Sequence, residues 1–181
     1  MAVARGATAD ARCEVRRLGP GEIHAAVPGF AAVLADCVAG GASVNFMAPF
    51  PLADAEAYWR NAAREAERDG RVFFAARDAD GVAGVVVLVP VRIPNQLHRA
   101  EITKLLVHRR ARRGGVGEAL MRAAEREARA MGRTLLTLDT ASQDAERLYR
   151  RLGWEEAGRI PGYALLPDGV PCEVALFFKR L

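Results

Sequence analysis

The stretch that decides the fold is Thr103–Met121, TKLLVHRRARRGGVGEALM, in which an apolar run passes into a basic, glycine-rich turn and then into an amphipathic segment. The spacing of the apolar residues predicts a strand that ends near His108 and a helix that begins near Val116. The first N–H groups of a helix have no intrahelical partner and lie at the positive end of the helix dipole. The stretch therefore predicts an anion-binding site where a strand turns into a helix.

The glycines and arginines of this turn indicate phosphate as the anion. Gly114, Gly115 and Gly117 let backbone N–H groups approach a phosphate closely, and Arg112 and Arg113 add positive charge. The alternative is that the glycines only permit a tight reversal of the chain. The turn lacks the lysine of a nucleotide P-loop, and its glycines do not follow the dinucleotide-binding pattern.

Outward from this stretch, the hydrophobic pattern predicts a mixed order of strands and helices. Antiparallel strands come first and a strand–helix–strand crossover follows, so we expect a mixed sheet in one α/β domain over residues 13–181, after a flexible tail over residues 1–12. The predicted strands cover residues 13–18, 72–75, 82–89, 99–108, 134–138, 154–159 and 173–178. The predicted helices cover residues 23–38, with a break or kink at Pro28–Gly29, 52–68, 116–131 and 145–152.

Composition narrows the class of protein. The chain has 181 residues, 51% hydrophobic and 27% charged, which is typical of a globular protein with one domain. It shows no membrane-length apolar run, and its aromatic residues, 7% of the chain, are too scattered for a nucleic-acid surface. Three distant cysteines favour the cytoplasm, and no His, Cys or acidic spacing indicates a metal site, so we expect no metal, no membrane and no nucleic acid.

Two motifs together resemble the GNAT superfamily of N-acetyltransferases. Arg112, Gly115 and Gly117 follow the apolar run with the spacing of that family's Arg/Gln-x-x-Gly-x-Gly/Ala pattern. Ala145, Tyr149, Gly153 and Trp154 fit its later A-x-x-x-Y-x-x-x-G-aromatic pattern. The resemblance implies an α/β GNAT fold, with a mixed, mostly antiparallel sheet, flanked by helices, and a V-shaped splay between two central parallel strands.

The same resemblance implies acetyl-coenzyme A as cosubstrate, with its pantetheine arm lying in the splay. Ser142 stands where many relatives carry an asparagine that contacts the pantetheine. The resemblance assigns coenzyme binding to Leu105, Leu106, Val107, Arg112, Arg113, Gly114, Gly115, Val116, Gly117, Glu118 and Ser142.

Acetyl transfer to an amine needs a base, because a primary amine with a pKa of about 10.4 is mostly a non-nucleophilic ammonium at pH 7. Asp139 ends the strand beside the coenzyme strand, although it could instead cap the following helix. Glu101 precedes Leu105 by four residues, so an unbulged strand would place both on one face about 13 Å apart. That distance favours a water relay or a role in substrate binding, and an ordinary edge-strand glutamate is the alternative.

The reaction also needs an acid for the departing thiolate. The resemblance makes Tyr149 that acid and makes the backbone N–H of Val107 the group that polarises the thioester carbonyl. Packing of the short helix against the sheet is the alternative role for Tyr149.

The acceptor is the least determined part of the reaction. Phe46, Met47 and Tyr163, together with Trp59, form a candidate acceptor wall, although such residues are more often core. Three segments resemble a detoxifying branch of the family, which implies a small amine such as an amino-acid-like β-lactam toxin. They cover residues 40–47, residues 99–101, and residues 160–163 followed by 167–169. A protein or peptide N-acetyltransferase and a non-catalytic acyl-coenzyme A sensor remain the alternatives, and a homodimer stays open as the assembly.

Overall fold

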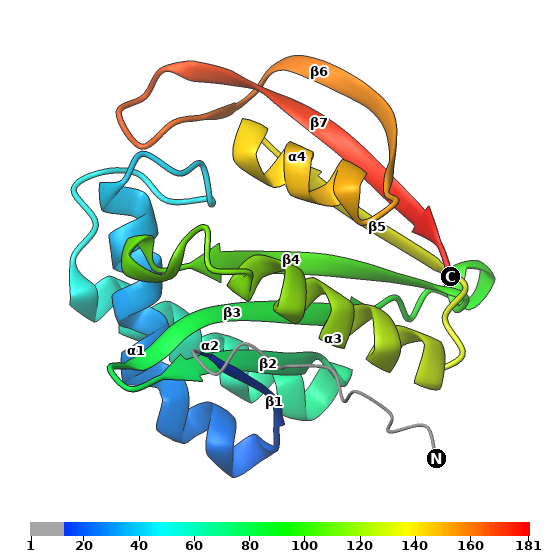
Figure 1. Ribbon diagram of the computed structural model, residues 1–181, viewed down its shortest axis with the longest axis horizontal. Helices are drawn as coiled ribbons and strands as arrows, with labels where there is room; N and C mark the ends of the chain where they lie inside the picture. Colours follow the sequence, from blue (N-terminus) through cyan, green and yellow to red (C-terminus); the bar gives the residue numbers. More distant parts are fainter. Residues whose placement is uncertain (1–12) are drawn as a thin grey trace, which may run out of the picture.

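The computed structural model describes residues 13–181, and the tail expected over residues 1–12 lies outside the described part of the chain. One sheet contains seven strands in the order β1-β2-β3-β4-β5-β7-β6 (Figure 1). The strands are β1 (Glu14–Leu18), β2 (Val72–Asp78), β3 (Gly81–Pro90), β4 (Arg99–Val107), β5 (Leu135–Thr140), β6 (Glu155–Leu165) and β7 (Pro171–Arg180). The helices are α1 (Pro20–Ala39), α2 (Leu52–Asp69), α3 (Val116–Ala130) and α4 (Gln143–Arg151), with short 3-10 turns at Pro94–Gln96 and Arg109–Ala111.

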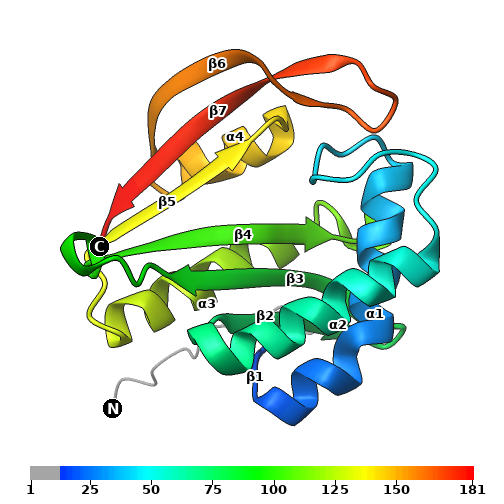
Figure 2. The same ribbon diagram turned by 180° about the vertical axis from the view of Figure 1, so that it is seen from behind.

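The two central strands separate soon after they meet. β4 and β5 are parallel, every other pairing is antiparallel, and the β4–β5 register holds only from Arg99–Leu135 to Glu101–Thr137. Beyond that point both strands continue and diverge, as both views show (Figures 1 and 2). The predicted mixed sheet with a splay is therefore confirmed, and the splay leaves strand-edge backbone groups of β4 facing a gap.

Helices cover both faces of the sheet. α3 and α4 lie on one face, while α1 and α2 lie on the other, which Figure 2 views from the front. Each pair of helices covers its own apolar cluster. On one face, Leu120 and Met121 of α3 are fully buried against the sheet. On the other face, Phe30 of α1 packs against Trp59 of α2 with ring centroids 5.1 Å apart. The two cores hold β4 from opposite sides.

Of the break or kink predicted at Pro28–Gly29, the break does not occur, because α1 is helical from Pro20 to Ala39 with Pro28 inside it. A side chain at position 29 would put its Cβ 2.5 Å from Cγ2 of Val82, so glycine lets the helix lie directly on β3. α1 is also long and apolar enough to cross a membrane by length and composition alone, but nine of its side chains are buried in the core beside it. Core packing accounts for both its apolar composition and its continuity through proline.

The last two strands run further than predicted. β6 continues through Pro161 and Gly162 as an irregular segment, where the register with β7 shifts between Ile160 and Ala164. A proline lacks the N–H that a ladder requires, so it is accommodated in such an irregularity. The hairpin therefore reaches far enough to lie over the loop between α1 and α2 (Figure 1).

We predict that Gly84→Ala destabilises the protein by about 1–3 kcal/mol, because the core there has no room for a methyl group. Its Cβ would lie 2.8 Å from the Leu106 carbonyl oxygen and 3.1 Å from Cδ1 of Leu120. Urea unfolding measures the effect. The matched control is Gly21→Ala in α1, whose Cβ meets nothing within 4 Å and should gain up to about 1 kcal/mol of helix stability. Equal effects of the two substitutions would contradict this packing.

Candidate active site

A bulge near the end of β4 changes the sheet face to which the following side chains point. The β3–β4 register shifts between Val85 and Val87, and Lys104 adopts a positive φ of 51°. Ile102 packs in the core beneath α3, whereas Leu106 packs in the core beneath α1. An even spacing of four residues would place both on one face, so the bulge has reversed the alternation.

The bulge corrects one expectation about Glu101. Glu101 and Leu105 do not share a face, because Leu105 packs against the α3 side after the bulge, on the side of Ile102. Glu101 instead alternates with Ile102 and so faces the α1 and α2 side. Its carboxylate pairs with the guanidinium of Arg99 at 2.7 Å, and Arg99 also donates to Thr137 Oγ1 at 3.0 Å. Glu101 therefore sits where the two strands part, bound to an arginine.

The backbone of Val107 faces the gap between the strands. The N–H of His108 donates to the Ala83 carbonyl of β3 at 2.9 Å. Successive N–H groups of a strand point in opposite directions, so the Val107 N–H points away from β3, to the side from which β5 has departed. This is the orientation needed to donate to a thioester carbonyl placed in the gap.

The turn after β4 presents backbone N–H groups as predicted. Gly115 precedes α3 in a left-handed conformation with φ 80°, a geometry that glycine adopts readily. Gly117 lies in the first turn of α3, where a Cβ would be 3.2 Å from Cδ2 of Leu148 in α4. Gly114 is exposed beside them, while Val116 is buried and fixes the helix to the core. The first-turn N–H groups are thus held beside the open end of the gap.

Some arginines of the turn are bound to other residues of the protein, and one has no such partner. Arg109 binds Asp36 of α1 through both its backbone N–H and its guanidinium, each at 2.8 Å, and Arg110 pairs with Asp78. Arg112 donates to the Val107 carbonyl at 3.1 Å. Arg113 makes no hydrogen bond or ion pair with any residue in the described part of the chain. Arg113 and the helix N–H groups are therefore the free donors for a phosphate.

Asp36 shows how firmly the turn is clamped to α1. Burial would raise the pKa of this carboxyl, but the hydrogen bonds from Arg109 outweigh that effect and lower the pKa. The clamp therefore remains ionised at neutral pH and holds the base of the anion site.

Two of the predicted coenzyme residues also have structural partners. Glu118 accepts a hydrogen bond from Arg122 at 2.9 Å, one turn along α3. Ser142 caps α4, since its hydroxyl accepts from the Ala145 N–H at 3.3 Å. The cap role considered for Asp139 thus belongs to Ser142.

Asp139 and Tyr149 lie near one another at the end of β5. Asp139 is exposed and makes no hydrogen bond or ion pair among residues 13–181, so its carboxylate is free. Tyr149 is 4% exposed, and its ring packs against Trp154 and Phe177 with centroids 6.0 and 5.7 Å away. Burial, and secondarily the charge of Asp139, raises the pKa of Tyr149, so its phenol stays protonated at neutral pH. Tyr149 therefore combines the packing role with the protonation state that an acid requires.

The predicted acceptor wall is only partly assembled. Phe46 packs against Phe50 and Tyr58 with centroids 4.4 and 5.1 Å away, while Met47 and Tyr163 are 46% and 57% exposed. Trp59, 1% exposed, belongs to the core and not to a substrate wall, because it lies beneath Phe30 and Phe73.

The loop that carries Phe46 is joined to the end of the β6–β7 hairpin. Ser43 Oγ donates to the Leu165 carbonyl and the Ala48 N–H donates to the Pro167 carbonyl, both at 2.9 Å. Both ribbon views show this loop beside the hairpin tip (Figures 1 and 2). The loop and the hairpin, which are far apart in the sequence, are therefore joined by hydrogen bonds to two hairpin carbonyls, and the Cys172 thiol adds a longer contact to Ser43 Oγ at 3.8 Å.

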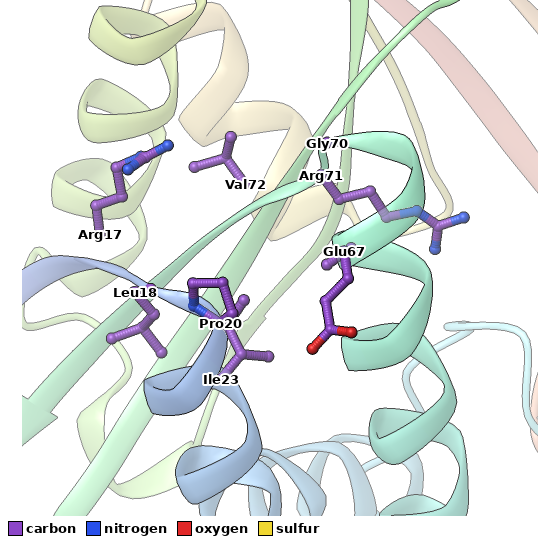
Figure 3. Close-up of a pocket in the computed structure, with 10 residues that line it drawn as sticks. Arg17, Leu18, Pro20, Ile23, Glu67, Gly70, Arg71 and Val72 are labelled. Carbon is purple, nitrogen blue, oxygen red and sulfur yellow. The ribbon is translucent and has the colours of Figure 1, made fainter.

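A separate cavity of about 210 Å³ lies at the other edge of the sheet, between the start of α1 and the end of α2 (Figure 3). Its charged residues already have partners: Glu67 pairs with His24 at 3.3 Å, and Arg71 pairs with Glu65 at 2.6 Å. None of the candidate coenzyme-binding, catalytic or acceptor residues lines this cavity.

Solved structures with the same fold act on different acceptors. A ribosomal-protein-alanine N-acetyltransferase from Brucella melitensis is 23% identical, with a TM-score of 0.75 over 93% of this chain and 99% of that one. A phosphinothricin acetyltransferase from Sinorhizobium meliloti, in complex with acetyl-coenzyme A, is 18% identical, with a TM-score of 0.76 over 94% of this chain and 89% of that one. At these identities the likeness establishes the fold.

The splayed α/β sheet and the anion-binding turn define a coenzyme A-dependent acyltransferase. The family model of the acetyltransferase (GNAT) family matches residues 30–154, and the chain belongs to that family. It is an N-acetyltransferase that uses acetyl-coenzyme A.

Sequence reasoning missed two features of this site. Arg99 belongs to the 99–101 segment that the sequence singles out, but its pairing with Glu101 gave no signal there. Lys104 could have been noticed, because it is one of only two lysines and interrupts an apolar strand.

We predict that Gly117→Glu lowers the affinity for coenzyme A about 100-fold or more, because a carboxylate would face the phosphates at the start of α3. Gly117→Gln, which adds the same bulk without the charge, is the matched control and should lose about tenfold less. Calorimetric titration with coenzyme A measures both. Unchanged affinity in the glutamate variant would contradict the location of the phosphates.

We predict that Tyr149→Phe lowers kcat about 100-fold, the scale of a lost general acid, while the dissociation constant for coenzyme A stays the same. The phenylalanine ring keeps the packing against Trp154 and Phe177, so the fold is retained. Steady-state kinetics and calorimetry separate the two quantities. An undiminished kcat would remove Tyr149 from the chemistry.

Proposed function

We propose that the acceptor is the primary amine of a small molecule, which attacks the thioester directly in a ternary complex. The observation that carries the proposal is the bridge across the acceptor side. The loop around Ser43 and Ala48 and the hairpin end at Leu165 and Pro167 are held together by two hydrogen bonds, which restricts the space available to an extended polypeptide.

A resemblance in sequence supports an amino-acid-like acceptor. Residues 40–47, Arg99–Glu101 and the hairpin segment 160–169 resemble the tabtoxin resistance acetyltransferase, which suggests an amino-acid-like or β-lactam toxin as one such acceptor. The phosphinothricin acetyltransferase also shares the fold. The ribosomal-protein-alanine enzyme shares it equally, so acetylation of a protein N-terminus is the alternative.

The proposed mechanism follows from the free groups around the gap. Asp139, whose carboxylate has no partner in residues 13–181, takes the proton from the acceptor ammonium, directly or through water. Glu101 is already bound by Arg99 and is better suited to holding water or substrate. The Val107 N–H stabilises the developing oxyanion, and Tyr149 protonates the departing thiolate. We place this activity in the cytoplasm, because Cys13, Cys37 and Cys172 are all free thiols.

Acetyl-coenzyme A consumption, read as free thiol release, tests the proposal across a panel of small amines, amino-acid-like β-lactams and peptides with free N-termini. We expect one class of small amine to exceed every peptide in kcat/KM by tenfold or more. Gly117→Glu, assayed in parallel, should release no thiol and so excludes a contaminating activity. A peptide that exceeds every small amine would overturn the proposal in favour of the alternative.

A further inference from the structure

Lys104 places a cation against the loop that precedes α2 and against Tyr58 of that helix. The bulge in β4 turns its side chain away from the α3 core, toward the loop that precedes α2. Its ammonium lies 3.3 Å from the Val44 carbonyl oxygen and 5.8 and 5.6 Å from the ring centroids of Phe46 and Tyr58. The cation therefore sits against the same loop that the hairpin bridges.

The charge of this lysine is incompletely compensated by the protein. An ammonium has three donors, and one of them is used by the Val44 carbonyl. Burial lowers the pKa of Lys104, and Asp139, acting from a longer distance, raises it. No carboxylate in residues 13–181 lies within 4.0 Å of the ammonium, although buried charges are ordinarily paired.

Lys179, the only other lysine, shows how this chain satisfies a partly buried ammonium. It lies 2.8 Å from a carboxylate oxygen of Glu125 and donates to the Leu152 carbonyl at 2.6 Å. Lys104 likewise donates to a backbone carbonyl, that of Val44, but no carboxylate in residues 13–181 lies within 4.0 Å of its ammonium. The missing partner is therefore an anion that the protein does not itself supply.

We propose that Lys104 binds a carboxylate of the acceptor, so that the substrate is an amine that also carries an acid group. This inference rests on the proposed function and names its substrate class. Lys104 lies three residues before Val107 on β4, and Asp139 lies on the neighbouring strand β5. The acid end of a zwitterionic acceptor lies against Lys104, and its ammonium end is directed toward Asp139 and the thioester.

The competing role is structural: through the Val44 carbonyl and the two aromatic rings, Lys104 could do no more than hold the loop. That role would affect all acceptors alike. An acceptor with a carboxylate and the same acceptor as its carboxamide distinguish the two roles, because only the first has an acid group. Comparing one pair of acceptors between variants also cancels the difference in basicity between their amines.

The experiment measures kcat/KM for L-amino acids and β-alanine, each paired with its carboxamide. We expect the wild type to prefer the acid, and Lys104→Met to reduce the acid-to-amide ratio about 10- to 100-fold, the range for a lost hydrogen-bonded charge pair. Lys104→Arg keeps the cation and should restore most of the preference. Tyr58→Leu, which loosens the loop but leaves the lysine, should lower kcat/KM for both acceptors and keep their ratio.

The outcomes separate this inference from the function on which it rests. An acid-to-amide ratio that is as high in Lys104→Met as in the wild type would overturn the role of Lys104 while leaving small-amine acetylation intact. An absence of turnover with every small amine of the panel would overturn the proposed function and this inference together.

Discussion

The early end of the β4–β5 pairing is the constraint on which the rest of this site depends. Only the register from Arg99–Leu135 to Glu101–Thr137 joins the two strands, so the remaining edge of β4 has no strand partner. Unpaired backbone groups are costly when enclosed, and a ligand that supplies complementary amide and carbonyl groups can satisfy them. The pantetheine arm of coenzyme A has that chemistry, and the start of α3 lies where its phosphates would follow.

The surrounding structure keeps this gap open and gives its two sides different roles. The ion pair of Asp36 with Arg109 ties the turn between β4 and α3 to α1. Ser142 caps α4, the helix that carries Tyr149. On the acceptor side, the bulge at Lys104 and the bridge between loop and hairpin place a cation in a restricted space. In the proposed arrangement, backbone groups form the coenzyme side, and side chains on the other side select the acceptor.

Most of the fold and the glycine-rich turn between β4 and α3 could be predicted, because they depend on local patterns. Apolar spacing and glycine positions indicate the strand–turn–helix from Thr103 to Met121 without any long-range contact. The bulge could not be predicted, since nothing in the run from Ile102 to Val107 marks a positive φ at a lysine. That single residue reverses the strand faces, so Glu101 and Leu105 do not share the face that an unbulged strand would have given them. The continuity of α1 and the length of the β6–β7 hairpin depend likewise on contacts distant in sequence.

Amide hydrogen exchange with and without acetyl-coenzyme A shows whether the coenzyme lies between β4 and β5, because it reports which backbone N–H groups the coenzyme covers. We predict slower exchange at Leu105 and Val107, on the open edge of β4, and at Gly117 and Glu118 in the first turn of α3. The paired amides of β2 should be unchanged. Protection confined to the cavity beside β1 and α2, with no change along β4, would contradict the placement of the coenzyme in the gap.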